Sequence, residues 1–177
     1  MHLLKPILAG IAVGLVFGAS GFAIAHPKDF SGTDNADNIF PGTGLKDTHE
    51  HEDTVHAEAG SDSVGGGDGA DNLYGQNGGD AIGGSEGFDL VEGDDGVDNA
   101  LYGHNGADTV RGGNNDDFVD EGGGNDTLVG GDGDFDLIDG TDGSGGDVLQ
   151  GGPGNNDTCE GEFEDTFGDS CEHNRRQ

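Results

Sequence analysis

The stretch Asp53–Asp98 reads DTVHAEAGSDSVGGGDGADNLYGQNGGDAIGGSEGFDLVEGDDGVD, and aspartate recurs in it at every ninth residue. Two further rows keep the same phase. A glycine lies two residues before nearly every one of these aspartates, and an apolar side chain lies two residues after most of them. The aspartates are Asp53, Asp62, Asp71, Asp80, Asp89 and Asp98; the glycines are Gly60, Gly69, Gly78, Gly87 and Gly96; the apolar residues are Val55, Val64, Leu73, Ile82 and Val91.

The segment Gly66–Tyr74, GGDGADNLY, contains the whole unit, G-G-x-G-x-D-x-U-x, where U is an aliphatic residue. This nonapeptide is typical of calcium-binding parallel β-helices. The chain resembles the RTX family of calcium-binding β-roll proteins over most of its length. The resemblance implies two nonapeptides per winding and two facing parallel sheets. It also implies that alternate aspartates lie on opposite sides, with Asp62, Asp80 and Asp98 on one and Asp71, Asp89 and Asp108 on the other.

Each residue type in the unit has a physical reason. A strand of three residues is too short to be stable alone, so it must stack on further copies. The aliphatic residue then points inward and forms a continuous core row. Glycines allow positive φ in the six-residue turn and bring carbonyl oxygens together. Because Ca²⁺ takes six to eight oxygen ligands, stacked turns that end in aspartate offer a suitable set. We therefore predict an all-β, parallel β-roll solenoid.

The repeat continues beyond Asp98 with occasional inserted residues, and Leu101 rather than Ala100 falls in the aliphatic row. Asn115 replaces a turn glycine in one repeat, and asparagine can also adopt the left-handed conformation. Asp94 and Asp95 lie off the nine-residue register. With Asp37 as a further candidate, the predicted Ca²⁺ ligands are turn carbonyls and the aspartates Asp53, Asp62, Asp71, Asp80, Asp89, Asp98, Asp108, Asp117, Asp126, Asp136, Asp147 and Asp157.

Composition limits the classes of partner. The formal charge is −31, with 6 Lys and Arg against 37 Asp and Glu. Such a chain lacks the positive charge that nucleic-acid binding needs, and charge alone would not hold it to an anionic membrane. High charge and 39 glycines are also typical of disordered chains. The nine-residue register argues against disorder for the calcium-loaded state and leaves it open for the calcium-free state.

The N-terminal residues Met1–Ala25 have the features of a secretory signal peptide. Lys5 provides the positive start, Ile7–Ala19 the apolar run, and Ala23-Ile24-Ala25 a small-x-small cleavage pattern. An uncleaved membrane anchor is the alternative, although the apolar run is short. We therefore expect a secreted protein without a membrane span after cleavage.

Residues 26–52 contain degenerate repeats and form the expected N-terminal cap, in which Asp37 and Ile39 keep the pattern. The tract His49–Asp53, together with His56, offers a second interpretation as a transition-metal site. No cysteine or helical spacing completes a tetrahedral ligand set there, so a solvated cap is the simpler interpretation.

The β-roll is expected over residues 53–159, followed by a C-terminal cap over residues 160–177. Cys159 takes the aliphatic position of the last regular repeat, and Cys171 is the second of two cysteines. In a secreted chain two cysteines favour one disulfide, which would stabilise the fold by roughly 2–3 kcal/mol. Free thiols or an intermolecular bond are the alternatives. Phe163 and Phe167 are expected to cover the last rung.

The sequence contains no serine-hydrolase elbow, zinc-protease motif, phosphate-binding loop or C-x-x-C pair, so we expect no enzymatic activity. RTX toxins of the type I route carry an uncleaved C-terminal signal, whereas this chain has an N-terminal leader, which favours general export. The first hypothesis is a secreted calcium-binding repeat protein. The second is an extracellular spacer, with a structural, surface or adhesion role, that calcium stiffens. Ice binding is the third and requires a regular outward threonine ladder. The sequence identifies no protein partner.

Overall fold

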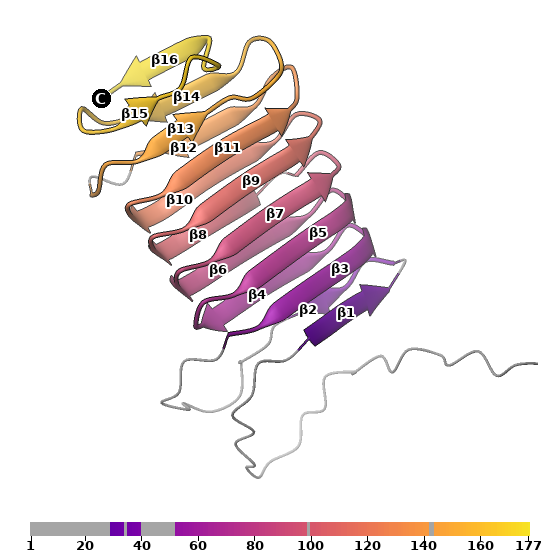
Figure 1. Ribbon diagram of the computed structural model, residues 1–177. Helices are drawn as coiled ribbons and strands as arrows, with labels where there is room; N and C mark the ends of the chain where they lie inside the picture. The colour runs from indigo at the N-terminus through magenta and orange to yellow at the C-terminus, as the bar shows by residue number, and fades with distance from the viewer. Residues whose placement is uncertain (1–28, 34, 40–51, 99, 142–143) are drawn as a thin grey trace, which may run out of the picture.

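The structure is a computed structural model that describes residues 29–33, 35–39, 52–98, 100–141 and 144–177. In these ranges every regular element is a β-strand, and the strands form two eight-stranded parallel sheets. Successive strands alternate between the sheets, so odd-numbered strands form one sheet and even-numbered strands the other (Figure 1). The chain therefore winds as a two-sheet solenoid, which confirms the predicted parallel β-roll.

The strands of the odd sheet are β1 (Asp29–Thr33), β3 (Thr54–Gly60), β5 (Asn72–Gly78), β7 (Leu90–Asp95), β9 (Thr109–Asn114), β11 (Thr127–Asp132), β13 (Val148–Gln150) and β15 (Thr166–Phe167). Those of the even sheet are β2 (Asn38–Ile39), β4 (Ser63–Asp68), β6 (Ala81–Gly87), β8 (Ala100–Gly106), β10 (Phe118–Gly124), β12 (Leu137–Gly140), β14 (Thr158–Gly161) and β16 (His173–Arg176). The predicted signal peptide and the histidines at 49 and 51 lie outside the described residues. Within the described ranges no helix has the length and hydrophobicity needed to cross a bilayer.

Most strands are longer than the three residues expected for each repeat. Strand β5 has 7 residues and includes Gln76, whose φ of 71° places it in the left-handed region. The prediction of three-residue strands is therefore wrong. The turn backbones of successive windings run side by side, so strand pairing continues through the bend. The equivalent second position of the nonapeptide is also left-handed at Glu58, Ser85, Asp94 and His104.

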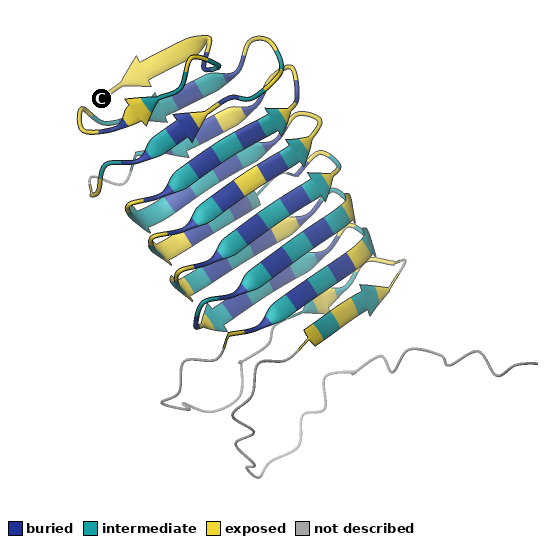
Figure 2. Ribbon diagram, in the orientation of Figure 1, coloured by how far each residue is buried: buried dark blue, intermediate teal, exposed yellow. Residues whose placement is uncertain are grey.

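The core is a single row of aliphatic side chains in each sheet. Buried and less buried residues alternate along the strands (Figure 2), and burying one such side chain stabilises the fold by about 1.5–3 kcal/mol. Leu101 is fully buried, as the one-residue insertion predicts. With at most 3% of their surface exposed, the members are Val55, Val64, Leu73, Ile82, Val91, Leu101, Val110, Val119, Leu128, Ile138 and Leu149.

The N-terminal end of the core is covered by β1 and β2. Ile39 pairs with Val64, and Phe30 pairs with Val55; both side chains pack partly buried against the core row. Ile39 therefore holds the aliphatic position that the sequence predicts for a degenerate repeat. Phe30 was not anticipated, because it precedes the first recognisable nonapeptide.

The C-terminal end is closed by a disulfide and an aromatic side chain. Cys159 and Cys171 are bonded, which confirms the predicted pairing, and both are buried. Phe167 extends the core row of the odd sheet as the partner of Leu149, and the Arg176 guanidinium lies 4.6 Å from the centre of its ring. Phe163 is 82% exposed, so the expectation that it covers the last rung is wrong.

Candidate metal centre

The aspartates of the repeat form two ladders, one along each edge of the roll. In each ladder the backbone N–H of an aspartate donates to Oδ1 of the aspartate one winding later, at 2.6–3.0 Å. The first ladder contains Asp37, Asp62, Asp80, Asp98, Asp117, Asp136 and Asp157. The second contains Asp53, Asp71, Asp89, Asp108, Asp126, Asp147 and Asp165. Alternate aspartates thus lie on opposite edges, as predicted.

The second carboxylate oxygen, Oδ2, is the chemically informative atom. In most ladder aspartates Oδ2 is buried, in a residue that is at most 3% exposed, and yet it has no hydrogen-bond partner in the protein. Leaving a buried carboxylate oxygen without a partner costs several kcal/mol, so this arrangement favours a bound cation. The residues concerned include Asp62, Asp71, Asp80, Asp89, Asp98, Asp108, Asp117, Asp136 and Asp157.

At most of these Oδ2 atoms a backbone carbonyl oxygen approaches beside the first glycine of the nonapeptide. A Cβ built on Gly66 would lie 2.5 Å from Asp71 Oδ2 and 2.6 Å from the carbonyl oxygen of Gly84, one winding later. Any side chain there would displace one of the two oxygens. The glycine is therefore required by the space that the oxygens occupy. The same convergence occurs at Gly75, Gly84, Gly93, Gly103, Gly112 and Gly130.

The donor set is suited to a hard cation. It consists of carboxylate and carbonyl oxygens without a nitrogen or sulfur ligand, and it repeats from winding to winding. Ca²⁺ is bound by six to eight such oxygens in flexible geometry, whereas Zn²⁺ in proteins is mostly held by imidazole and thiolate. The described residues thus fit Ca²⁺, and the family comparison points the same way.

Four copies of the model for the RTX calcium-binding nonapeptide repeat match the chain, at residues 49–82, 83–119, 98–128 and 141–157. Together they cover more than half of the sequence. The chain belongs to the RTX calcium-binding repeat family. No curated protein matches it at a significant level. Its RTX repeats are calcium-binding repeats, and RTX repeats combined with a disulfide are typical of extracellular proteins.

Burial raises the pKa of many carboxyl groups in this RTX roll. Desolvation is the largest cause in each case, and the hydrogen bond from the preceding aspartate N–H opposes it. Neighbouring ladder carboxylates raise the pKa further, to about 8 for Asp117 and about 7 for Asp108. A cation would stabilise the charged form, so its binding releases protons. The pKa is raised to about 6 at Asp71, Asp89, Asp98 and Asp136.

The ladders contain two carboxylates that sequence reasoning missed. Asp165 ends the second ladder, and Glu172 ends the first by accepting a hydrogen bond from Asp157 N–H at 3.0 Å. Asp165 could have been found, because Phe167 follows it at the aliphatic spacing. Glu172 belongs to no nonapeptide and had no comparable signal.

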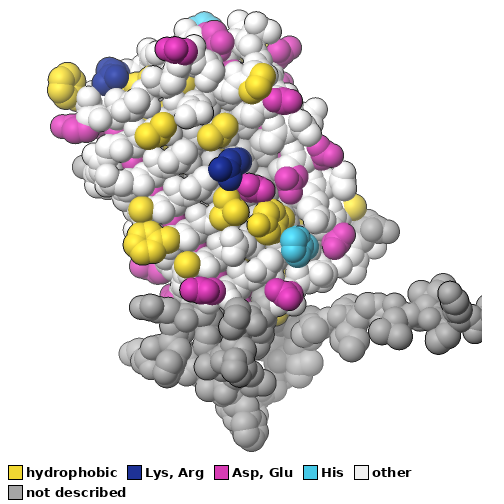
Figure 3. Space-filling view, viewed as in Figure 1, with side chains coloured by type: hydrophobic (Ala, Val, Ile, Leu, Met, Phe, Trp, Pro, Cys, Tyr) yellow, Lys and Arg dark blue, Asp and Glu magenta, His cyan; other side chains and the backbone are white. Residues whose placement is uncertain are grey.

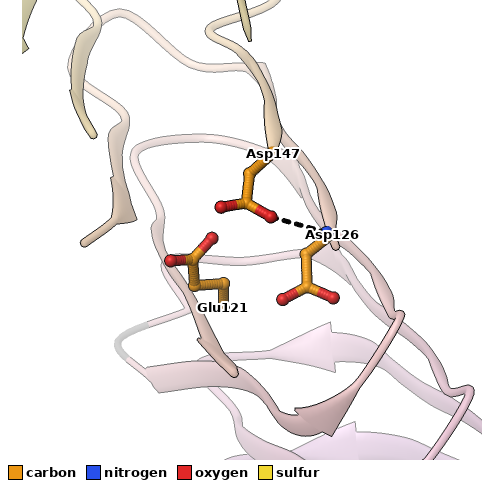
Figure 4. Close-up of side chains that lie close together, drawn as sticks. All are labelled: Glu121, Asp126 and Asp147. Atoms are coloured by element: carbon orange, nitrogen blue, oxygen red, sulfur yellow. Dashed lines mark hydrogen bonds between the residues drawn. The ribbon is translucent and has the colours of Figure 1, made fainter. Parts of the chain in front are cut away.

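Two first positions of the nonapeptide in the RTX roll carry a side chain instead of glycine, Ala57 and Glu121. Glu121 on β10 takes the first position of its nonapeptide and is 1% exposed. Its carboxylate faces those of Asp126 and Asp147 (Figure 4), and ligand oxygens of the three lie within 4.8 Å of one another. Sequence reasoning did not single out Glu121, because only the aspartates in the nine-residue register were considered as carboxylate ligands.

The outer surface is acidic with few compensating cations. Asp and Glu are spread over the face seen in Figure 3, where Lys and Arg are sparse. In the described part of the chain, Arg111 pairs with Glu92 at 2.8 Å and Arg175 pairs with Glu160. The charge of the ladders is therefore little neutralised by the surface of the protein.

The predicted histidine tract is only partly within the described residues. His56 lies on the odd sheet, where its ring stacks on Tyr74 with centroids 4.9 Å apart, and its Nδ1 is 3.4 Å from Gln76 Nε2. These contacts account for His56 without a metal. The transition-metal interpretation for the rest of the tract remains a hypothesis.

Threonines occupy part of one outer row of the odd sheet, which bears on the ice-binding hypothesis. Strand register aligns the row from β3 to β15, and its members alternate with the buried aliphatic residues. The row does not form the regular threonine ladder that this hypothesis requires. It reads Thr54, Asn72, Leu90, Thr109, Thr127, Val148 and Thr166.

Proposed function

We propose that the chain is a secreted, non-enzymatic protein that binds several Ca²⁺ between adjacent windings and folds as it binds them. The row of buried aspartate Oδ2 atoms without hydrogen-bond partners is the observation that carries this proposal. The ligands would be the twelve register aspartates from Asp53 to Asp157, together with the carbonyl oxygens of the first position of the nonapeptide. Glu121 would add a third carboxylate beside Asp126 and Asp147.

Coupling of folding to calcium is supported by the balance of forces in the roll. The core contains one aliphatic side chain per nonapeptide, so hydrophobic burial is small for a chain of this length. Stacking the windings places buried carboxylates on neighbouring rungs, where ladder neighbours raise the pKa of Asp108 and of Asp117. Neutralising this repulsion is the contribution that a bound Ca²⁺ would make, and its binding free energy then becomes folding free energy.

Secretion is supported by the predicted leader and by the Cys159–Cys171 disulfide, because disulfides form and persist in oxidising compartments. Extracellular calcium modules commonly bind at ~10⁻⁴–10⁻³ M. A chain with this affinity would stay unfolded at cytosolic calcium and fold after export. The proposed absence of catalysis is supported by the lack of a catalytic motif in the sequence and by the use of the buried carboxylates as ligands.

Circular dichroism of the chain without residues 1–25, first in chelator and then during titration to millimolar Ca²⁺, tests the coupling. We expect a coil spectrum that converts to a β spectrum, with several bound ions counted by native mass spectrometry. A full β spectrum in excess chelator would contradict folding on binding. A folded chain with no bound Ca²⁺ would contradict the function itself.

A further inference from the structure

The first ladder does not end with its last nonapeptide. After Asp157 and β14, the segment 168–172 returns to the same edge of the roll and precedes β16. Cys171 in this segment is bonded to Cys159, two residues after Asp157. The segment matches no nonapeptide, and the family match ends at residue 157.

The carbonyl oxygen of Ser170 takes the position that a nonapeptide carbonyl takes elsewhere. A Cβ on Gly151 would lie 2.5 Å from Ser170 O and 2.8 Å from Asp157 Oδ2. One winding earlier, a Cβ on Gly130 would lie 2.5 Å from Gly151 O and 2.5 Å from Asp136 Oδ2. The oxygen pair beside Gly151 therefore has the geometry of a regular winding, although one member comes from a non-repeat segment.

Glu172 reproduces the second feature of a regular winding. Its Oε2 accepts the hydrogen bond from Asp157 N–H, as Oδ1 of the next aspartate does along the rest of the ladder. The side chain of Asp157 is fully buried, and its Oδ2 has no hydrogen-bond partner. This oxygen points to the same place as the Ser170 carbonyl.

The end of the second ladder shows what a closed end looks like. Asp165 Oδ2 accepts a hydrogen bond from Glu162 N–H at 2.5 Å. The carboxylate oxygen that would face an ion is thus already hydrogen-bonded, and a Cβ on Gly161 would meet Asp165 Oδ2 without a carbonyl oxygen beside it. The two ladders end differently, and only the first ends with a buried, unpartnered carboxylate oxygen beside a carbonyl.

We propose that segment 168–172 completes an additional Ca²⁺ site at the end of the first ladder. Asp157 Oδ2 and Ser170 O are ligands, Glu172 supplies negative charge, and the Cys159–Cys171 disulfide holds Ser170 and Glu172 in place. The proposal rests on the calcium-binding function proposed above. It adds a site that the nonapeptide pattern does not contain, and it gives the disulfide a role in metal binding besides stability.

The test counts Ca²⁺ bound to the full secreted chain by native mass spectrometry, with isothermal titration for affinity. In the Cys159→Val/Cys171→Ala variant, valine keeps the apolar side chain of the core row while the bond is removed. We expect the ion count to fall by about one while the β spectrum in Ca²⁺ is kept. An unchanged count with unchanged affinities would overturn the terminal site and leave the general function standing. A wild-type chain without bound Ca²⁺ would overturn both.

Glu172→Gln decides the case in which the cysteine variant does not fold. It keeps the disulfide and a hydrogen-bond acceptor but removes one charge beside Asp157. We expect one ion to bind at least roughly fivefold more weakly, since unit charges ~4 Å apart interact that strongly even in bulk water. Glu164→Gln, which removes the same charge from an exposed position in the turn before Asp165, is the matched control and should leave all affinities unchanged. Equal titrations for the two variants would overturn the proposal.

Discussion

The winding with Gly75 and the winding with Glu121 follow the same backbone path but fill the first position of the nonapeptide differently. A Cβ on Gly75 would lie 2.5 Å from Asp80 Oδ2 and 2.8 Å from Gly93 O. At Glu121 a whole side chain is buried and brings its own carboxylate towards the ladder. Neither residue has a left-handed φ. The comparison teaches that the glycine serves the oxygen ligands and not the backbone conformation.

Gly75→Ala should have the largest effect, because its Cβ would overlap both a carboxylate and a backbone carbonyl oxygen. We expect a destabilisation of about 1–3 kcal/mol in saturating Ca²⁺ and the loss of about one ion. Thermal unfolding and ion counting measure these. Gly146→Ala is the control, since a Cβ there would lie 3.7 Å from its nearest neighbour, the carbonyl oxygen of Glu164. If Gly75→Ala unfolds at the wild-type temperature and binds as many ions as the wild type, the glycine is not needed to make room for the oxygen ligands.

Asp89→Ala should come next, because it removes one ligand without adding atoms. Its Oδ1 also accepts the hydrogen bond from Asp71 N–H, so two windings are affected. We expect a higher Ca²⁺ midpoint and about one ion fewer. The control is Asp95→Ala, an exposed position off the register. Asp94 is less suitable, because its φ of 71° would strain an alanine. Equal Ca²⁺ midpoints for the two variants would show that the nine-residue register does not determine which aspartates bind Ca²⁺.

The pH dependence of folding in chelator should show a smaller effect, which distinguishes the windings of Asp108 and Asp117 from the earlier windings. The pKa values of the ladder carboxyls are raised above the unfolded value of 3.8, to about 6 at Asp71 and about 8 at Asp117. Between pH 3.8 and the folded pKa, each such carboxyl keeps a proton in the folded roll that it releases in the unfolded chain. The stability of the calcium-free roll therefore falls as the pH rises through this range. This contribution is complete below pH 3.8 and lost above the folded pKa.

We therefore expect more β structure in chelator at pH 5 than at pH 8, measured by circular dichroism. Carboxyl titration by NMR should place the pKa values of Asp117 and Asp108 above those of the ladder carboxyls of the earlier windings. A β signal that increases with pH in chelator would contradict the direction of these shifts.

Glu121→Gln should have the smallest effect and act on one winding only. Removing one of three close carboxylates relieves repulsion in chelator and weakens attraction for Ca²⁺ at that winding. We expect a slightly higher melting temperature in chelator and a weaker affinity for one ion, by less than tenfold. Calorimetry in chelator and in Ca²⁺ measures both. Shifts of the same sign in the two conditions would show that Glu121 acts through packing instead.

The sequence predicts the regular part of this RTX roll well because its signals are local. The nine-residue spacing of Asp62, Asp71 and Asp80 determines which side chains share an edge, and the spacing to Leu73 determines which are buried. Even the left-handed backbone of Asn115, with φ of 84°, follows from residue type. Where each nonapeptide repeats the same spacing of aspartate, glycine and aliphatic residue, the structure of one winding predicts that of the others.

The parts that sequence could not predict depend on contacts between distant segments. Ser170 reaches the first ladder only because a disulfide and β16 return the chain to Asp157. Phe163 and Phe167 are equally apolar, yet only Phe167 falls in register with Leu149. Glu121 looks like an interruption until the opposite carboxylate of Asp147 is placed beside it. None of these contacts leaves a periodic pattern in the sequence.

The direction of the ladder hydrogen bonds has a consequence for the order of assembly. In every rung the carboxylate belongs to the later winding and the N–H to the earlier one, as between Asp71 and Asp89. A ribosome releases the earlier winding first, when its acceptor has not yet been made. Each winding is thus completed only by the one synthesised after it. At the end of the first ladder no later nonapeptide follows, so Glu172 supplies the acceptor that completes the last winding.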